Sequence, residues 1–406
     1  MDYIPRALDA VVRTAAKEFP SVVLTGPRQS GKTTLLRHTF AASHAYVSLE
    51  PPDVRDSATH DPRGFLALHP PPVIFDEVQY APDLLPYIKE VIDSRRRDKG
   101  LYLLTGSQNL LLMERVTETL AGRAAMLRLL PLSYREAQND PEKPLFWENA
   151  TRQRRTPPPM PLPDLWMSFV RGSYPEVVAD PKRDIPLWHA SYVQTYLERD
   201  VRGLRQIGDL TLFQAFLRTI AARSGQLLNL TDVSRGIGLA INTAKAWLAV
   251  LEATYQVVIL RPYFANLGKR LVKTPKVYFT DTGTLCYLLG LRDPVHAMSS
   301  PMAGPIFETA VFSEILKTGL GRGEDPHIYF FRTATGIEVD FLLERNGNLI
   351  PIEVKSSATP RPEMAAPIVM LRKDLPRRVQ LGYVVHTGDV LLPLEPDVVA
   401  IPFSAL

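Results

Sequence analysis

The chain has 406 residues, of which 45% are hydrophobic and 22% charged, and a formal net charge of +4. This length exceeds one ordinary core and predicts two to four domains, while the mild positive charge permits a nucleic-acid partner without arguing for one. No apolar run reaches the length of a membrane span, early charges such as Asp2, Arg6 and Asp9 exclude a secretory segment, and the single Cys286 excludes an internal disulfide, so we expect a cytoplasmic protein.

A phosphate-binding loop is the first motif along the chain. A short apolar strand, Ser21 to Leu24, leads into a match to G-x-x-x-x-G-K-[ST], and a helix follows. In this pattern backbone N–H groups turn towards the phosphates, Lys32 reaches the terminal phosphates, and the Thr33 hydroxyl binds Mg²⁺. The predicted nucleotide-binding residues are Gly26, Pro27, Arg28, Gln29, Ser30, Gly31, Lys32, Thr33 and Thr34.

Two acids close the next apolar strand. In "PPVIFDEVQ" the strand ends abruptly at Asp76 and Glu77. In P-loop enzymes the first acid at such a position holds Mg²⁺ and the second polarises the attacking water. Capping of the following helix is the alternative, but a phosphate loop about 45 residues upstream favours the Mg²⁺ site.

Two further polar residues are candidates for catalysis, each with an open alternative. Ser107 ends the strand of "GLYLLTGSQ", at the sheet edge where ligands bind in open α/β sheets, and either contacts the γ-phosphate or belongs to an ordinary turn. Arg123, in "LAGR", is either the arginine that a neighbouring subunit donates to the transferring phosphoryl group or part of a surface ion pair. The sequence does not choose between these alternatives.

The motifs together resemble a known family. "LTGPRQSGKTT", "FDEVQ", "LTGSQ", "LAGR" and "PLSYRE" resemble the AAA-type ATPases of bacteria and archaea that carry a C-terminal domain of uncharacterised function. The later stretches "GSYPEVV", "YVQTYLERDV" and "GIEVDFLLE" followed by "IEVK" are similar to that second region, so the resemblance covers nearly the whole chain. It implies an AAA+ parallel sheet in residues 1–138, ATP and Mg²⁺ as cofactors, and a homo-oligomer such as a hexameric ring.

The middle of the chain changes character twice. Residues 139–164 are rich in proline and show no helical or strand period, so they predict a surface linker. The arginines at 152, 154 and 155 are candidates for phosphate contact, although a solvated charge run explains them better. Residues 165–208 are helical in pattern, and Arg199 is either a nucleotide sensor or half of an Arg–Asp pair.

Residues 209–295 have the pattern of a winged helix. Three helices precede two or three strands with a turn at Asn266 and Gly268. The third helix has no arginine placed to bind guanine, so we expect backbone-dominated, salt-sensitive DNA binding, with protein docking as the alternative. Tyr263 and Phe264 are available for stacking. The predicted nucleic-acid contacts are Arg261, Lys269, Arg270, Lys273 and Lys276.

Residues 296–406 resemble the PD-(D/E)XK nuclease fold. A helix carrying Glu308 is followed by three strands, a helix and a further strand, with Asp340, Glu353 and Lys355 on the strands. The resemblance implies an Mg²⁺ site at Asp340, Glu353 and the Val354 carbonyl, with Lys355 steering or activating water. A cross-strand salt bridge between Glu353 and Lys355 is the alternative.

The sequence thus predicts an α/β protein with a P-loop AAA+ sheet, a helical and winged-helix region, and a nuclease-like domain. The preferred function is an oligomeric, Mg²⁺-dependent ATPase that acts on DNA. Two other classes stay open: an ATP-dependent regulatory switch on a protein partner, and a metal-dependent nuclease gated by ATP.

Overall fold

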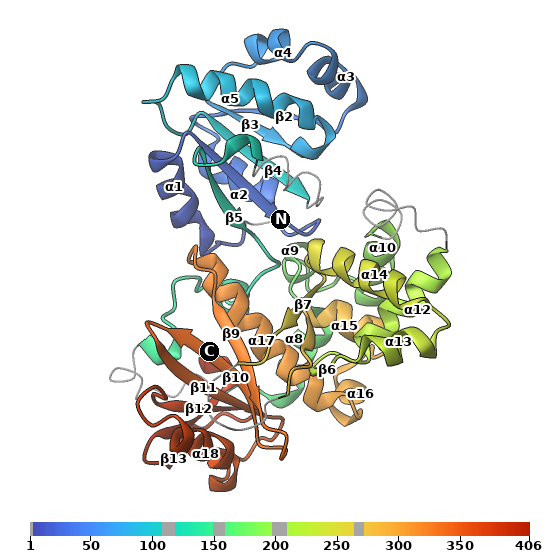
Figure 1. Ribbon diagram of the computed structural model, residues 1–406, viewed down its shortest axis with the longest axis vertical. Helices are drawn as coiled ribbons and strands as arrows, with labels where there is room; N and C mark the ends of the chain where they lie inside the picture. Colours follow the sequence, from blue (N-terminus) through green and yellow to red (C-terminus); the bar gives the residue numbers. More distant parts are fainter. Residues whose placement is uncertain (1–2, 108–117, 149–158, 197–208, 264–271) are drawn as a thin grey trace.

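A five-stranded parallel sheet forms the N-terminal part of the computed structural model, which describes residues 3–107, 118–148, 159–196, 209–263 and 272–406 (Figure 1). The strand order is β2-β3-β4-β1-β5, and every neighbouring pair is parallel. The inner strands are buried at every residue, as continuous apolar runs predict for a sheet covered on both faces. The bounds are β1 Ser21–Gly26, β2 Ala45–Ser48, β3 Val73–Asp76, β4 Tyr102–Ser107 and β5 Ala124–Arg128.

Helices cover both faces of this sheet. Along β1, Val22 and Leu24 point to one face and pack with α1 (Leu8–Glu18) and α2 (Lys32–Phe40). Val23 points to the other face and packs with residues of α4 (Pro62–Leu68) and α5 (Leu85–Ser94), and α3 (Pro52–His60) lies beside α4. The period of two along the strand therefore divides the core of this part into two layers.

The middle part is mainly helical. Besides its helices it contains a small antiparallel sheet with the order β6-β8-β7. The helices are α7 Tyr134–Ala137, α8 Leu162–Arg171, α9 Pro175–Val178, α10 Ile185–Tyr196, α12 Leu210–Ala221, α13 Leu230–Gly236, α14 Ile241–Ala253, α15 Thr282–Leu288 and α16 Pro294–Ser299. The strands are β6 Gln226–Leu227, β7 Val257–Leu260 and β8 Lys276–Phe279. None of the described helices is long and apolar enough to cross a membrane.

The C-terminal part is a mixed sheet with the order β13-β14-β12-β11-β10-β9. The expected order of one helix, three strands, a helix and a strand is present, and β13 and β14 extend the sheet beyond it. The bounds are α17 Ala303–Gly321, β9 His327–Arg332, β10 Glu338–Arg345, β11 Asn348–Lys355, α18 Ala366–Asp374, β12 Gly382–His386, β13 Leu392–Glu395 and β14 Val398–Pro402.

Helix α17 connects all three parts. It is buried along almost its whole length after Ile306, including its charged residues Glu314 and Lys317. It packs on β8 and α15 of the middle part and on β11 of its own sheet, and it also meets α1 and β5 of the N-terminal part (Figure 1). One hydrophobic core consequently runs from Leu130 to Leu406, through the middle and C-terminal parts.

Part of the predicted linker at 139–164 packs against the rest of the chain, although most of its described residues are exposed or half-buried. Leu145 and Phe146 are buried, and the Phe146 ring meets Tyr383 edge-on at 5.1 Å between centroids. The Lys143 ammonium donates to the backbone oxygen of Ser404 at 2.8 Å, and α8 already begins at residue 162. These contacts are between residues far apart in the chain, so a lack of local periodicity could not reveal them. The three linker arginines lie outside the described residues.

Candidate functional site

The phosphate-binding loop connects β1 to α2 and lines a pocket of about 420 Å³. Its backbone turns through positive φ at Gly26, Gln29 and Gly31, with values of 152°, 59° and 93°. A Cβ atom at Gly26 would lie 2.1 Å from the carbonyl oxygen of Leu129, so only glycine fits there. The loop ends at the N-terminus of α2, where N–H groups and the helix dipole favour an anion.

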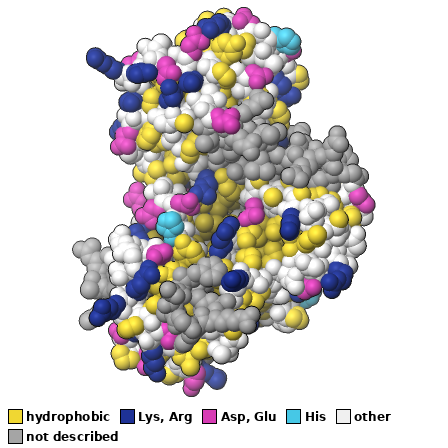
Figure 2. Space-filling model, in the orientation of Figure 1, with side chains coloured by type: hydrophobic (Ala, Val, Ile, Leu, Met, Phe, Trp, Pro, Cys, Tyr) yellow, Lys and Arg dark blue, Asp and Glu magenta, His cyan; other side chains and the backbone are white. Residues whose placement is uncertain are grey.

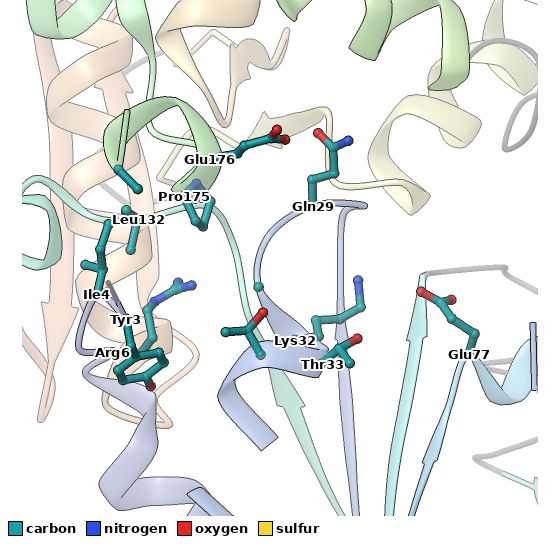
Figure 3. A pocket seen from close by; sticks show the side chains of 13 residues that line it. Tyr3, Ile4, Arg6, Gln29, Lys32, Thr33, Glu77, Leu132, Pro175 and Glu176 are labelled. Carbon is teal, nitrogen blue, oxygen red and sulfur yellow. The ribbon is translucent and has the colours of Figure 1, made fainter. Parts of the chain in front are cut away.

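Lys32 lies in the centre of the pocket. Its ammonium donates to the carbonyl oxygens of Gly26 at 3.0 Å and Pro27 at 2.9 Å. Figure 3 shows the side chain between Glu77 on one side and the residues of the opposite wall on the other. The cation is therefore held over the loop, within the space that a triphosphate would enter.

Asp76 gathers hydroxyl groups from three elements. Thr33 of α2 donates to Oδ1 at 2.7 Å, the Thr105 hydroxyl of β4 donates to the same oxygen, and Tyr46 of β2 donates to Oδ2 at 2.9 Å. Burial and the nearby Asp76 raise the pKa of Tyr46 to about 12, which keeps the phenol a donor. Adjacent carboxylate and hydroxyl oxygens are the ligands that Mg²⁺ prefers, so Thr33 and Asp76 fit the Mg²⁺ of a bound nucleotide.

Glu77 is presented to the pocket by an unusual backbone. Its φ of 59° lies in the left-handed region, and its N–H donates to the Thr105 hydroxyl at 3.1 Å. Its carboxylate accepts from the Ser107 N–H at 3.2 Å and hydroxyl at 3.1 Å, and from the Gln79 amide. Burial would raise the pKa of Glu77, but Lys32 and these hydrogen bonds together lower it. The carboxylate is thus ionised and suited to polarise water.

Ser107 lies at the carboxyl ends of the strands of the sheet, and Arg123 lies at their amino ends. Ser107 pairs in register with Gly26 and contacts Glu77, so it lies at the pocket edge. Arg123 directly precedes Ala124, which pairs with Ser21 at the start of β1. Arg123 therefore lies at the amino ends of these strands, far from the pocket. Its guanidinium binds both carboxylate oxygens of Asp93, at 2.8 and 3.0 Å. The ion pair is therefore formed within this chain, away from its own nucleotide pocket.

Sequence reasoning missed the opposite wall of the pocket. Tyr3, Ile4, Leu132, Pro175, Glu176 and Ala179 line it (Figure 3). Arg6 holds this wall to the loop, because its buried guanidinium donates to the carbonyl oxygens of Ser30 and Leu130, both at 2.7 Å, and to Glu136 at 3.0 Å. Of these residues, Pro175 and Glu176 belong to "GSYPEVV" and Leu132 to "PLSYRE", but neither stretch is a motif of known chemistry. A single arginine near the N-terminus gives no signal.

A tyrosine of the middle part also contacts the strand that carries the loop. The hydroxyl groups of Tyr255 and Thr25 lie 3.1 Å apart, and Thr25 immediately precedes Gly26. Tyr255 stands in the turn between α14 and β7 with a φ of 57°. The middle part is thus hydrogen-bonded to the base of the phosphate-binding loop.

Of the predicted DNA contacts, only some lie in the described part of the chain and on its surface. Arg261 and Lys273 are exposed, whereas Lys269, Arg270 and Phe264 lie outside the described residues. Lys276 was predicted wrongly, because only 3% of it is exposed and its ammonium lies among carboxylates. Tyr263 is also buried, against Tyr329 and Arg378, and is not available for stacking.

The structure brings the four residues of the predicted nuclease-like site into one acidic cluster. Glu353 is paired with Lys355, Asp340 accepts from the Val354 N–H at 2.8 Å, and Glu308 is paired with Lys276. However, no three Asp, Glu, His or Cys side chains of the described chain are grouped to hold a metal ion. Because the Lys276 ammonium lies 2.8 Å from Glu308 and 3.8 Å from Asp340, the arrangement does not fit the Mg²⁺ site that the resemblance implied.

Two acids of this cluster have raised pKa values. Burial, together with Asp340, raises the pKa of Glu308 to about 7 and that of Glu353 to about 8, against the opposing effects of Lys276 and Lys355. Burial also raises the pKa of Asp340. The cluster therefore takes up protons near neutral pH.

Comparisons with known proteins agree with the division seen in the fold. A family model described as AAA domain matches residues 18–138, and two domains of unknown function, DUF8612 and DUF4143, match residues 162–295 and 303–406. The N-terminal part is therefore a P-loop domain of AAA type, which confirms that expectation. The winged-helix and nuclease-like assignments stay predictions.

Similar whole proteins were also found. The uncharacterized proteins Rv2008c of Mycobacterium tuberculosis and Mb2031c of Mycobacterium bovis are each 30% identical over 396 residues, which is 97% of this chain and 82% of each relative. A solved structure, described as the Walker-type ATPase PABY2304 of Pyrococcus abyssi, has a TM-score of 0.46 and 16% identity, over 71% of this chain and 96% of that chain.

The close packing at Gly26 gives a test of the loop geometry. Gly26→Ala places a methyl group against the Leu129 carbonyl, and we expect a loss of about 3 kcal/mol in unfolding free energy and of nucleotide binding. Gly347→Ala is the matched control, because its φ is 77° but no atom lies within 4 Å of the added Cβ, so it should cost about 1 kcal/mol. Chemical denaturation and nucleotide titration measure both variants. Equal costs would contradict the close contact.

The raised pKa values give a pH dependence of stability. Between the unfolded pKa of about 4.3 and the folded values of about 7 and 8, the folded chain binds more protons, so unfolding free energy should fall as pH rises through this window. Glu353→Gln should flatten the fall, whereas the exposed Glu395→Gln should not. Melting temperatures from pH 5 to about 9 would measure this. An unchanged slope in Glu353→Gln would contradict it.

Proposed function

We propose that this chain, which belongs to the family of the two mycobacterial proteins Rv2008c and Mb2031c, is an Mg²⁺-dependent ATPase that couples hydrolysis to binding or remodelling of DNA. The observation that carries the proposal is the meeting of Lys32, Thr33 and an ionised Glu77 in one pocket beside the glycine turns, with Asp76 bonded to Thr33 next to it. Each group has the charge and position that phosphoryl transfer to water needs.

The side chains of the pocket divide the work of hydrolysis. Lys32 exchanges the carbonyl oxygens of Gly26 and Pro27 for terminal phosphate oxygens and so stabilises negative charge there. Glu77 accepts a hydrogen bond from the attacking water and orients it. Ser107, bonded to Glu77, fixes the orientation of that carboxylate. Bound Mg²⁺, held by Thr33 and Asp76, supplies neutralisation of charge on the phosphates.

Coupling to the rest of the chain runs through contacts at the loop. Tyr255 bonds Thr25 at the base of the loop, and Pro175 and Glu176 of α9 form the opposite wall of the pocket. A bound nucleotide would therefore touch both the N-terminal domain and the middle part. This arrangement supports a conformational change of the middle part when the bound nucleotide loses its terminal phosphate.

Two observations support binding to DNA: the order of the secondary-structure elements and the exposed Lys and Arg side chains. Helix α12, strand β6, helices α13 and α14, and strands β7 and β8 follow the order of a winged helix. Lys245 of α14, Arg261 and Lys273 are exposed on this part. They would contact phosphates and make binding sensitive to salt.

A regulatory switch on a protein partner is the second candidate. It is favoured by the burial of Lys276, which removes one of the predicted phosphate contacts. On the face in Figure 2, the Lys and Arg side chains that are drawn stand among Asp and Glu side chains and form no continuous basic stripe. We propose a homo-oligomer, such as a ring, in either case; Arg123 reaches a neighbour's phosphate there only if Asp93 releases it.

Replacing Glu77 separates binding from hydrolysis. Glu77→Gln should keep Mg²⁺-dependent ATP affinity and lower turnover by about 10²–10⁴-fold, because the amide cannot act as a base. The matched control is Glu90→Gln, whose carboxylate pairs with Arg63 on the surface at 2.8 Å. Nucleotide titration and phosphate release measure the two effects. Full turnover in Glu77→Gln would exclude its catalytic role.

Replacing Tyr255 tests the coupling. Tyr255→Phe removes only the hydroxyl that contacts Thr25, so the basal ATPase rate should stay within about twofold while stimulation by duplex or single-stranded DNA at low salt is lost. Tyr287→Phe, elsewhere in the middle part, should keep the stimulation. If DNA does not change the ATPase rate of the wild-type protein, the result favours the regulatory switch on a protein partner over a function on DNA.

A further inference from the structure

The acidic cluster of the C-terminal part contains a cation of its own. The Lys276 ammonium, from β8, lies 2.8 Å from Glu308 Oε1, 2.6 Å from Glu338 Oε1 and 3.8 Å from Asp340 Oδ1. It is 3% exposed, and the Phe330 ring lies under it, with 5.6 Å between the ammonium and the ring centroid. A buried cation thus stands among carboxylates from α17 and β10.

The remaining oxygens of these carboxylates are largely engaged. Asp340 Oδ2 accepts from the Val354 N–H at 2.8 Å, and Glu338 Oε2 accepts from Arg332 at 2.7 Å. The Tyr278 hydroxyl, two residues after Lys276 on β8, donates to Glu308 Oε1, the oxygen that the ammonium also contacts. The Lys276 ammonium is thus surrounded by carboxylates that also accept hydrogen bonds from a backbone N–H, a tyrosine hydroxyl and a guanidinium group.

Glu353 has a buried carboxylate oxygen without a hydrogen-bond donor in the described part of the chain. Glu353 is 3% exposed; one of its oxygens pairs with Lys355, and the other, Oε2, is buried with no hydrogen-bond partner in the described chain. Asp340 acts electrostatically on Glu353, so the two acids are neighbours. A buried acceptor without a donor is costly and indicates room for a cation or a proton.

We propose that the Lys276 ammonium is the resident cation of this pocket and excludes divalent metal from it, and that Mg²⁺ or Mn²⁺ binds at Glu308, Asp340 and Glu353 only once that ammonium is removed. A divalent ion of this kind needs about six oxygen ligands. Glu308 and Glu338 each already give a carboxylate oxygen to the Lys276 ammonium. The ion would also stand within a few ångströms of a buried positive charge, which repels it.

The consequence concerns the role of the C-terminal part. With Lys276 in place it has no divalent metal to assist attack on a phosphodiester, so the gated nuclease is excluded for this chain. The same ammonium instead ties β8 of the middle part to α17 and β10. The inference does not depend on the proposed ATPase activity, because it involves different residues.

Mn²⁺ binding to the full-length, nucleotide-free protein tests the proposal. Free Mn²⁺ is followed by electron paramagnetic resonance in titrations of wild type, Asp340→Asn, Lys276→Met and the double variant. Wild type and Asp340→Asn should bind equally, since any Mn²⁺ at Thr33 and Asp76 is common to both. Lys276→Met should bind one additional Mn²⁺ per chain, and the double variant should lose it.

Two outcomes would overturn the proposal. Mn²⁺ binding by wild type that Asp340→Asn abolishes would mean that the ammonium does not exclude metal. A folded Lys276→Met variant, as judged by its circular dichroism, that binds no more Mn²⁺ than wild type would mean that the carboxylates cannot form a metal site. The first comparison needs no change at Lys276, so it decides the central claim even if Lys276→Met fails to fold.

Discussion

Asp76 is the side chain on which the nucleotide site depends. Its two carboxylate oxygens accept hydrogen bonds from hydroxyl groups of β2, α2 and β4, so one acid fixes the spacing of three elements at the carboxyl edge of the sheet. The parallel register then places Gly26 beside Ser107 and puts Glu77 within their reach. A site of this kind is preorganised, because the sheet orients its polar groups before any ligand arrives.

The pocket is completed by residues that do not belong to the sheet. Arg6 joins the N-terminal segment to the loop and to Glu136, while α9 supplies the facing wall. Tyr255 of the middle part and α17 of the C-terminal part also contact the N-terminal domain. Nucleotide binding and the arrangement of the three parts are therefore physically connected, whichever partner the chain acts on.

The acidic cluster shows how far a resemblance in sequence extends. The order of elements and the positions of Glu308, Asp340 and Glu353 were found correctly, and these side chains do gather. The cation among them was not found, because Lys276 enters from a strand that precedes them and pairs with Glu308 and Glu338. At the start of an apolar strand a lysine is expected to be exposed, and nothing local distinguishes a buried one.

The sequence by itself determined what is local. The glycine turns, Lys32, Thr33 and the acids after a buried strand lie within short stretches whose backbone demands permit few other residue types, so the P-loop domain could be recognised without coordinates. Only the tertiary structure decided the roles of Arg6, Arg123, Tyr255 and Lys276, and the burial of residues 145–146. Each of these depends on a partner far along the chain, and charge or periodicity in one segment carries no record of the segment that packs against it.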